Sequence, residues 1–196
     1  LIEKMNVMTR HRGPDDTGVF CEQGISLGHN RLSIIDLSSA AHQPMVSHNK
    51  RFTITFNGEI YNFQILRDEL EKTGVKFHSK SDTEVILELF ARLGPGMLTK
   101  LNGIFALAIW DSQQQSLFLA RDHFGVKPLY YYWDGKRIIF SSEAKALFAH
   151  NIPKKLNQTA LNKYLRFLYV QGPETMWEGV RKLPAGHFAI IKNNNF

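Results

Sequence analysis

A series of short apolar segments separated by turn residues constrains the fold of this chain more than any other feature. Their β-branched and aromatic content predicts strands, and the short intervals between the last four of them predict hairpin links. The segments are residues 52–56 (FTITF), 104–110 (IFALAIW), 116–121, 128–133 and 137–142. Strands joined by hairpins pair antiparallel, so we expect a mixed fold built on antiparallel sheet.

Helical spacing and capping residues predict two internal helices. Apolar positions recur at helical intervals over residues 63–73, and Gly74 follows as a C-cap. Residues 82–93 come directly after Ser81, which is a good N-cap, and Glu84 stands at the spacing of a capping box. Together with the strands, these helices indicate an α+β fold.

The two ends of the chain add further elements. Residues 2–9 are predicted to be helical, and residues 18–22 and 25–35 to be the two strands of a hairpin. The remaining predicted elements are helices at residues 143–149 and 159–170, a connector at 150–158 between them, and a last strand at 186–192.

Composition limits the classes of function. With 196 residues, 43% of them hydrophobic, the chain can bury the core of one domain with a short extra segment. The formal charge of +6 is spread over single basic residues and pairs, without a basic run between aromatics, so we expect no nucleic-acid partner. No apolar stretch is long enough to span a bilayer, so we expect no membrane partner.

Cys21 is the single cysteine, which excludes an internal disulfide and a cysteine-cluster metal site. By default such a cysteine is an inert, buried or half-buried thiol. One cysteine and no basic-then-apolar leader together predict a cytoplasmic protein. The eight histidines show no metal-binding spacing on a helix, so we predict no metal site.

Four stretches resemble the motifs of one enzyme family, in the family's order along the chain. They are residues 29–36 (HNRLSIID), 57–62 (NGEIYN), 81–84 (SDTE) and 121–130 (RDHFGVKPLY). The chain resembles class II glutamine amidotransferases, most closely the N-terminal glutaminase domain of the glutamine-hydrolysing asparagine synthetase family. In the last stretch, Gly125 and Pro128 are predicted to set a turn, and Arg121 and Asp122 to form a supporting ion pair.

The resemblance implies a fold and a division of the chain. The fold is a four-layer αββα sandwich, in which helices cover the outer faces of two stacked antiparallel sheets. Residues 1–155 would be the glutaminase domain. Residues 156–196 would be a final helix, a strand and the linker towards a synthetase domain.

Glutamine presents an α-carboxylate, an α-ammonium group and a side-chain amide whose oxygen gains negative charge during hydrolysis. A site for it needs a fixed cation, a fixed carboxylate and two hydrogen-bond donors. By resemblance, Arg31 grips the α-carboxylate through its planar guanidinium. The same motif assigns Leu32, Ser33, Ile34 and Ile35 to the glutamine-binding surface. The alternative for Arg31 is a surface arginine at a strand end.

The resemblance makes Asn57 and Gly58 the two donors of an oxyanion hole, one through its side-chain amide and the other through its backbone N–H. Glu59 would lie beside the substrate ammonium group, and Asp82 would pair with that group. Plainer alternatives exist for these residues. Asn-Gly after a strand usually forms a tight turn, which we predict here, and an aspartate in the first turn of a helix meets the helix dipole favourably.

The family's nucleophile is a cysteine at the N-terminus of the mature protein, on a strand that lies centrally in one sheet. This sequence begins with Leu1, so we expect that cysteine and strand to be missing and the chain to be inactive by itself. The unpaired edges would destabilise the chain or lead it to form a homodimer. Cys21 as a substitute nucleophile would have no free α-amine as its base.

The resemblance also implies a parent protein, an asparagine synthetase-type C–N ligase. It would hydrolyse L-glutamine and pass the ammonia to aspartate activated by ATP. ATP and magnesium would belong to its synthetase domain, and this chain would need no cofactor. The alternative hypothesis is a non-catalytic glutamine-binding or assembly domain without the nucleophile. A paired-carboxylate site at Asp15 and Asp16 is less favoured than turn and cap roles for these residues.

Overall fold

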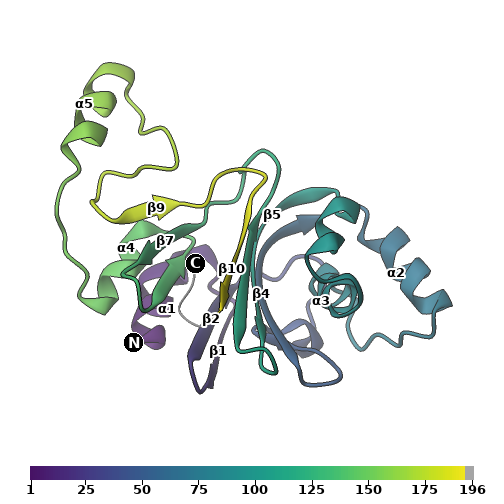
Figure 1. Cartoon of the computed structure of the whole chain (residues 1–196). Coiled ribbons are helices and arrows are strands. Elements are labelled where there is room, and N and C mark those ends of the chain that lie inside the picture. Colours follow the sequence, from purple (N-terminus) through teal and green to yellow (C-terminus); the bar gives the residue numbers. More distant parts are fainter. Residues whose placement is uncertain (193–196) are drawn as a thin grey trace.

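The chain folds as stacked layers of helices and strands (Figure 1). The computed structural model describes residues 1–192. Its largest sheet has five antiparallel strands in the order β10-β6-β5-β4-β3. In chain order these strands are β3 (Met45–Val46), β4 (Phe52–Ile60), β5 (Gly103–Asp111), β6 (Ser116–Arg121) and β10 (Phe188–Lys192).

The second layer of strands consists of two small antiparallel sheets. One pairs β1 (Asp16–Glu22) with β2 (Ile25–Arg31), and the other has the order β8-β7-β9. The strands of this other sheet are β7 (Tyr130–Trp133), β8 (Ile138–Ser141) and β9 (Val180–Lys182). Among the described residues β2 pairs only with β1 and β8 only with β7, so each has an unpaired edge.

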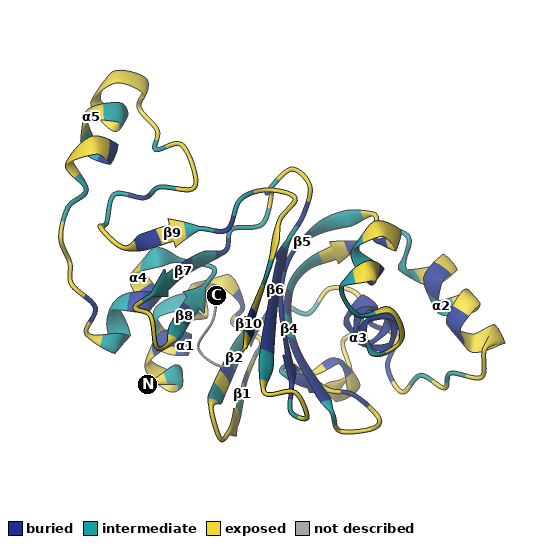
Figure 2. Ribbon diagram, in the orientation of Figure 1, coloured by how far each residue is buried: buried dark blue, intermediate teal, exposed yellow. Residues whose placement is uncertain are grey.

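Helices cover both outer faces of the two β layers. α2 (Phe63–Lys72) and α3 (Asp82–Leu93) bury apolar residues against the five-stranded sheet in the largest core. On the opposite side, α1 (Ile2–Thr9) contacts β2, and α4 (Ala144–Leu147) contacts α1 and β8. α5 (Gln158–Phe167) stands apart from these layers (Figure 2). The expected αββα sandwich is confirmed, with its second β layer divided into two sheets.

Most predicted elements are present close to their expected bounds. The helix predicted over residues 82–93 is α3, and Ser81 caps it by accepting a hydrogen bond from the Glu84 N–H. The return bond of a capping box is absent, because the Glu84 carboxylate accepts from the N–H groups of His78 and Ser79 instead. Within residues 1–192, no helix is both long and apolar enough to cross a bilayer.

The predicted turn at Asn57-Gly58 is wrong. β4 continues through both residues, and the long pairing with β5 holds them extended, with Gly58 opposite Phe105. A Cβ atom at Gly58 would lie 2.2 Å from the carbonyl oxygen of Ile104. Glycine is therefore needed here for the close approach of two strands, not for a turn.

The predicted ion pair between Arg121 and Asp122 is also wrong, because both side chains bind backbone groups. The Arg121 guanidinium donates to the carbonyl oxygens of Gly125, Lys127 and Leu183 at 2.6–2.7 Å. Gly125 has a φ of +65°, which glycine adopts at little cost, so the turn predicted at this residue is confirmed.

Asp122 connects β5 to the turn after β6. Its buried carboxylate accepts hydrogen bonds from the N–H groups of Phe105, Phe124, Val126 and Lys127 at 3.0–3.1 Å. Burial by itself raises the pKa of this carboxyl group, but the four N–H groups outweigh burial and hold the pKa below its usual range. The carboxylate is therefore a structural anion that fixes the backbone around it.

Replacing this anion tests its role. Asp122→Ala leaves four N–H groups without their acceptor, and a buried unsatisfied donor costs about 1–3 kcal/mol. We expect the free energy of unfolding to fall by roughly 3 kcal/mol or more, measured by urea denaturation. Asp134→Ala is the matched control, because Asp134 also accepts backbone bonds but lies in an exposed turn. Equal losses for the two variants would contradict the account.

Candidate active site

The backbone N–H of Gly58 points away from the β4–β5 ladder. Opposite Gly58 on β5, the N–H of Phe105 donates to the Asp122 carboxylate, and the C=O of Phe105 accepts the N–H of Asp122. Both groups of Phe105 therefore face away from β4. Gly58 and Phe105 are therefore a non-hydrogen-bonded pair, and the N–H of Gly58 faces the other edge of β4. At that edge Gln43 accepts the Phe56 N–H. The described residues provide no acceptor for the Gly58 N–H.

Asn57 supplies a second donor without a partner. Its Nδ2 atom is buried and has no hydrogen-bond partner among the described residues. An unpaired buried amide costs free energy, so proteins rarely keep one unless a ligand or water uses it. Asn57 and Gly58 therefore present two adjacent donors, which is what the stabilisation of an oxyanion requires.

The side chain of Asp82, which begins α3, lies at this same edge of β4, where the strand ends at Ile60. Its buried carboxylate accepts a hydrogen bond from the Ile60 N–H at 3.0 Å, and Glu59 lies near enough to act on it electrostatically. Burial raises the pKa of Asp82 above its usual range, and the negative charge of Glu59 adds to the rise, although backbone hydrogen bonds oppose it. Two carboxylates here favour binding of a cation.

Arg31 ends β2, so the strand predicted over residues 25–35 is shorter than expected. The Arg31 side chain is buried, and its guanidinium donates to the carbonyl oxygens of Asp36 and Ser38. These bonds use one N–H on each terminal nitrogen, and a guanidinium has five. Arg31 is therefore not the surface residue of the alternative interpretation, and it orders the loop of residues 32–38.

The loop after Arg31 exposes apolar side chains. Leu32 is 55%, Ile34 is 73% and Ile35 is 39% exposed. Ser33 anchors the loop, because its N–H donates to the Asp15 carboxylate at 2.8 Å. Exposed apolar side chains on an anchored loop are a surface available to a ligand or to another segment.

Two further contacts bring the first three predicted motifs together. Asp36 of the Arg31 loop accepts a hydrogen bond from the Lys80 N–H, directly before the segment that carries Asp82. Gln43, which binds the Phe56 N–H at 2.7 Å, also donates to Thr83 at the start of α3. Sequence reasoning missed Gln43, because no local pattern shows that a glutamine in a loop bridges a strand and a helix.

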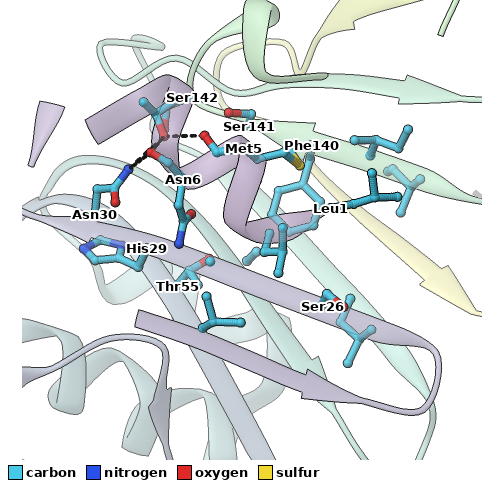
Figure 3. A pocket seen from close by; sticks show the side chains of 18 of the residues that line it. Leu1, Met5, Asn6, Ser26, His29, Asn30, Thr55, Phe140, Ser141 and Ser142 are labelled. Carbon is cyan, nitrogen blue, oxygen red and sulfur yellow. Dashed lines mark hydrogen bonds between the residues drawn. The ribbon is translucent and has the colours of Figure 1, made fainter. Parts of the chain in front are cut away.

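A groove of about 860 Å³ lies between β2 and β8, with β4 and β5 as its floor. Figure 3 shows Asn6, His29 and Thr55 near one end of it. Among the predicted site residues Asn57 alone lines this groove. Burial first, and then the nearby Arg31, lower the pKa of His29 to about 4, so its imidazole is neutral at pH 7.

Cys21 is exposed, so the expectation of a buried or half-buried thiol is wrong. It lies on β1 near the hairpin turn, opposite Ser26 on β2. The Asp15 and Asp16 carboxylates do not form a catalytic pair. Asp15 binds Ser33, and Asp16 binds His42 at 2.6 Å.

One cluster outside the predicted site was not anticipated from spacing. His48, His78 and Glu84 come from three separate segments, and their ligand-type atoms lie within 4.8 Å of one another. The prediction of no metal site considered only spacing within single helices. A search for tertiary clusters requires the fold, so no signal in the sequence could have found this one.

The family and the fold identified by comparison with known proteins are consistent with this geometry. The family described as "Glutamine amidotransferase domain" matches residues 1–196. A solved structure of glutamine phosphoribosylpyrophosphate amidotransferase from Bacillus subtilis is similar, with a TM-score of 0.70 at 21% identity. The similarity covers 98% of this chain and 44% of that one, and it supports the αββα fold.

Curated relatives at higher sequence identity show which members of this family the chain resembles. "Asparagine synthetase [glutamine-hydrolyzing] 1" of Bacillus subtilis (strain 168) is 40% identical over 97% of this chain and 30% of its own length. "Putative asparagine synthetase [glutamine-hydrolyzing] 2" of Methanocaldococcus jannaschii is 40% identical over 94% of this chain and 39% of its own length. The chain belongs to the glutamine amidotransferase domain family and is homologous to glutamine-hydrolysing asparagine synthetases. It spans about a third of the length of these relatives.

The raised pKa of Asp82 predicts a pH-dependent effect of Asp82→Asn. A carboxyl group whose pKa is raised in the folded state destabilises the fold once pH exceeds its usual value of 3.8, and fully so above the folded-state pKa. Asparagine keeps an acceptor for the Ile60 N–H without the charge. We therefore expect Asp82→Asn to raise the free energy of unfolding at pH 7, with the gain disappearing as pH falls towards about 4.

The measurement is urea denaturation of both proteins at several pH values. Asp68→Asn serves as the control, because Asp68 is an exposed helical aspartate. A pH-independent effect of Asp82→Asn, or equal effects of the two substitutions, would contradict the electrostatic interpretation.

Proposed function

We propose that this domain binds L-glutamine and catalyses hydrolysis of its side-chain amide to glutamate and ammonia. The observation that supports this most directly is the adjacent pair of unpartnered donors, the Asn57 Nδ2 atom and the Gly58 N–H. Preorganised donors stabilise charge that develops on an amide oxygen, and they need not reorganise during the reaction.

The remaining predicted residues take the two charged ends of glutamine. Asp82 pairs with the α-ammonium group, and Glu59 lies beside it. Arg31 binds the α-carboxylate through the N–H groups that its backbone contacts leave free. The loop residues Leu32, Ser33, Ile34 and Ile35 cover the bound glutamine.

The nucleophile is proposed to enter through the groove between β2 and β8. Within residues 1–192 both strands have an unpaired edge there, and a single extended segment between them would pair with both. Such a strand would carry an N-terminal cysteine to the vicinity of Asn57, which lines the groove. The thiolate attacks the amide carbon, ammonia leaves after protonation, and water releases glutamate from the thioester.

A larger parent protein is proposed to use the ammonia. The curated relatives are named as asparagine synthetases and are about three times as long as this chain. The parent would be a cytoplasmic ligase that binds ATP and Mg²⁺ in a second domain and passes ammonia to activated aspartate. Exposed apolar residues on and after α5, namely Leu165, Phe167, Leu168 and Tyr169, support docking of that domain beside the linking segment 156–196.

The second candidate is a glutamine-binding module without turnover. The unpartnered donors at Asn57 and Gly58 and the buried Asp82 carboxylate allow it, since these groups by themselves require only that a ligand binds, not that it reacts. The two candidates differ in whether the wild-type parent protein hydrolyses the glutamine that it binds.

Asn57→Ala in the parent protein tests the proposed function. Loss of one oxyanion donor should lower kcat for glutamine hydrolysis by about 10²–10³, while KM for glutamine changes little. A coupled glutamate assay measures both constants. Asn102→Ala is the matched control, because Asn102 is an exposed asparagine just before β5.

A kcat for Asn57→Ala within about twofold of that of the control would contradict the assignment of Asn57. Glutamine binding by calorimetry without any hydrolysis by the wild-type protein would favour the binding module instead.

A further inference from the structure

We propose that His48, His78 and Glu84 form a binding site for one divalent transition-metal ion, with zinc as the preferred ion. His48 lies in the loop between β3 and β4, His78 between α2 and α3, and Glu84 in the first turn of α3. The proposal does not rest on the glutamine site, since none of these side chains is assigned to it.

The donor set is of the kind that zinc uses. Zinc in proteins is bound by imidazole nitrogen and carboxylate oxygen at about 2.0–2.2 Å, so neighbouring donors around it lie about 3.3 Å apart. The ligand-type atoms of the three side chains lie within 4.8 Å of one another. His48 and His78 are exposed, so small side-chain rotations can close the difference. Two imidazoles and a carboxylate leave a fourth position for water.

Glu84 is held in place as a ligand before any ion binds. Its Oε2 atom accepts from the Ser79 N–H at 2.7 Å and from the Ser79 hydroxyl at 2.6 Å. Among the described residues its Oε1 atom accepts only the His78 N–H, at 2.9 Å, and it lies 3.7 Å from the His78 Nδ1 atom. Hydrogen bonds of this kind orient metal-binding carboxylates, and Oε1 keeps capacity for an ion.

The imidazole rings of His48 and His78 lie close to each other and to the Glu84 carboxylate. The ring centroids of His48 and His78 are 4.1 Å apart and the rings are tilted by 44°, so both rings lie close enough to offer a nitrogen to one ion. A bound dication would take one nitrogen from each ring and would also compensate the charge of Glu84.

The site is open to solvent and has room for a hydrated ion. The cluster lines a recess of about 230 Å³, whose walls also include Met45 and Glu88. Glu88 is held by an ion pair with Arg92 at 2.8 Å, so it is not counted among the ligands. An ion bound here would join the β3–β4 loop to the start of α3 and restrain both.

Metal binding by the full-length protein tests the proposal. After treatment with a chelator, zinc is titrated by calorimetry, and cobalt is titrated by visible absorption as a probe of tetrahedral geometry. We expect His48→Ala and His78→Ala each to weaken zinc binding by roughly tenfold or more and to lose the cobalt absorption. Zinc should raise the Tm of the wild-type protein but not of these variants.

His123→Ala is the matched control, because His123 is an exposed histidine outside the cluster. It should bind zinc as the wild-type protein does, so sites elsewhere in the full-length protein do not affect the comparison. If His78 interacts with Glu84 only through an ion pair, and the three side chains share no metal ion, then the His48→Ala variant will bind zinc as tightly as the His123→Ala control does. That outcome, or no zinc uptake by the wild-type protein, would overturn the proposal.

Discussion

The pairing of Gly58 with Phe105 is the constraint on which the proposed site depends. Asp122 binds the N–H of Phe105 with its carboxylate and the C=O of Phe105 with its own N–H. Phe105 therefore cannot use these groups on β4, and the N–H of Gly58 is directed to the open edge. Asn57, one residue earlier, turns its side chain into the groove. The turn that Asp122 fixes and the donor pair of Asn57 and Gly58 are far apart in sequence, and the register of β4 against β5 links them.

The same arrangement gives the proposed site two features that cost stability. Asn57 holds a buried amide without a partner among the described residues, and Asp82 holds a buried carboxyl group with a raised pKa. Both features cost free energy in the protein without ligand. The large core between the five-stranded sheet and the helices α2 and α3 compensates for them. A ligand with a cationic group and an amide oxygen would satisfy both.

Local patterns were sufficient to predict α3 and the strands around β4. They failed where tertiary pairing overrides local preference. Asn-Gly favours a turn by itself, but the partner strand β5 keeps Gly58 extended. Likewise, the adjacent opposite charges of Arg121 and Asp122 favour an ion pair, whereas both side chains bind backbone groups, including those of the distant Leu183 and Phe105. These partners cannot be read from a sequence window.

The residues of the candidate site could be proposed from the sequence, but their arrangement in space could not. Asn57, Gly58, Asp82 and Arg31 came from motifs that resemble one family, and contacts such as that of Asp36 with Lys80 join their segments. The groove between two unpaired strand edges arises from the way the second β layer is divided. Only the packed fold could reveal that groove, because it depends on which strands remain unpaired.

A crystal structure of the parent protein with glutamine bound tests the central claim most directly. We expect the side-chain amide oxygen of glutamine to lie about 2.7–3.1 Å from both the Asn57 Nδ2 atom and the Gly58 nitrogen, or to approach that position closely. The ammonium group should lie against the Asp82 carboxylate. Glutamine bound elsewhere, or bound with its amide directed away from Asn57 and Gly58, would contradict the account.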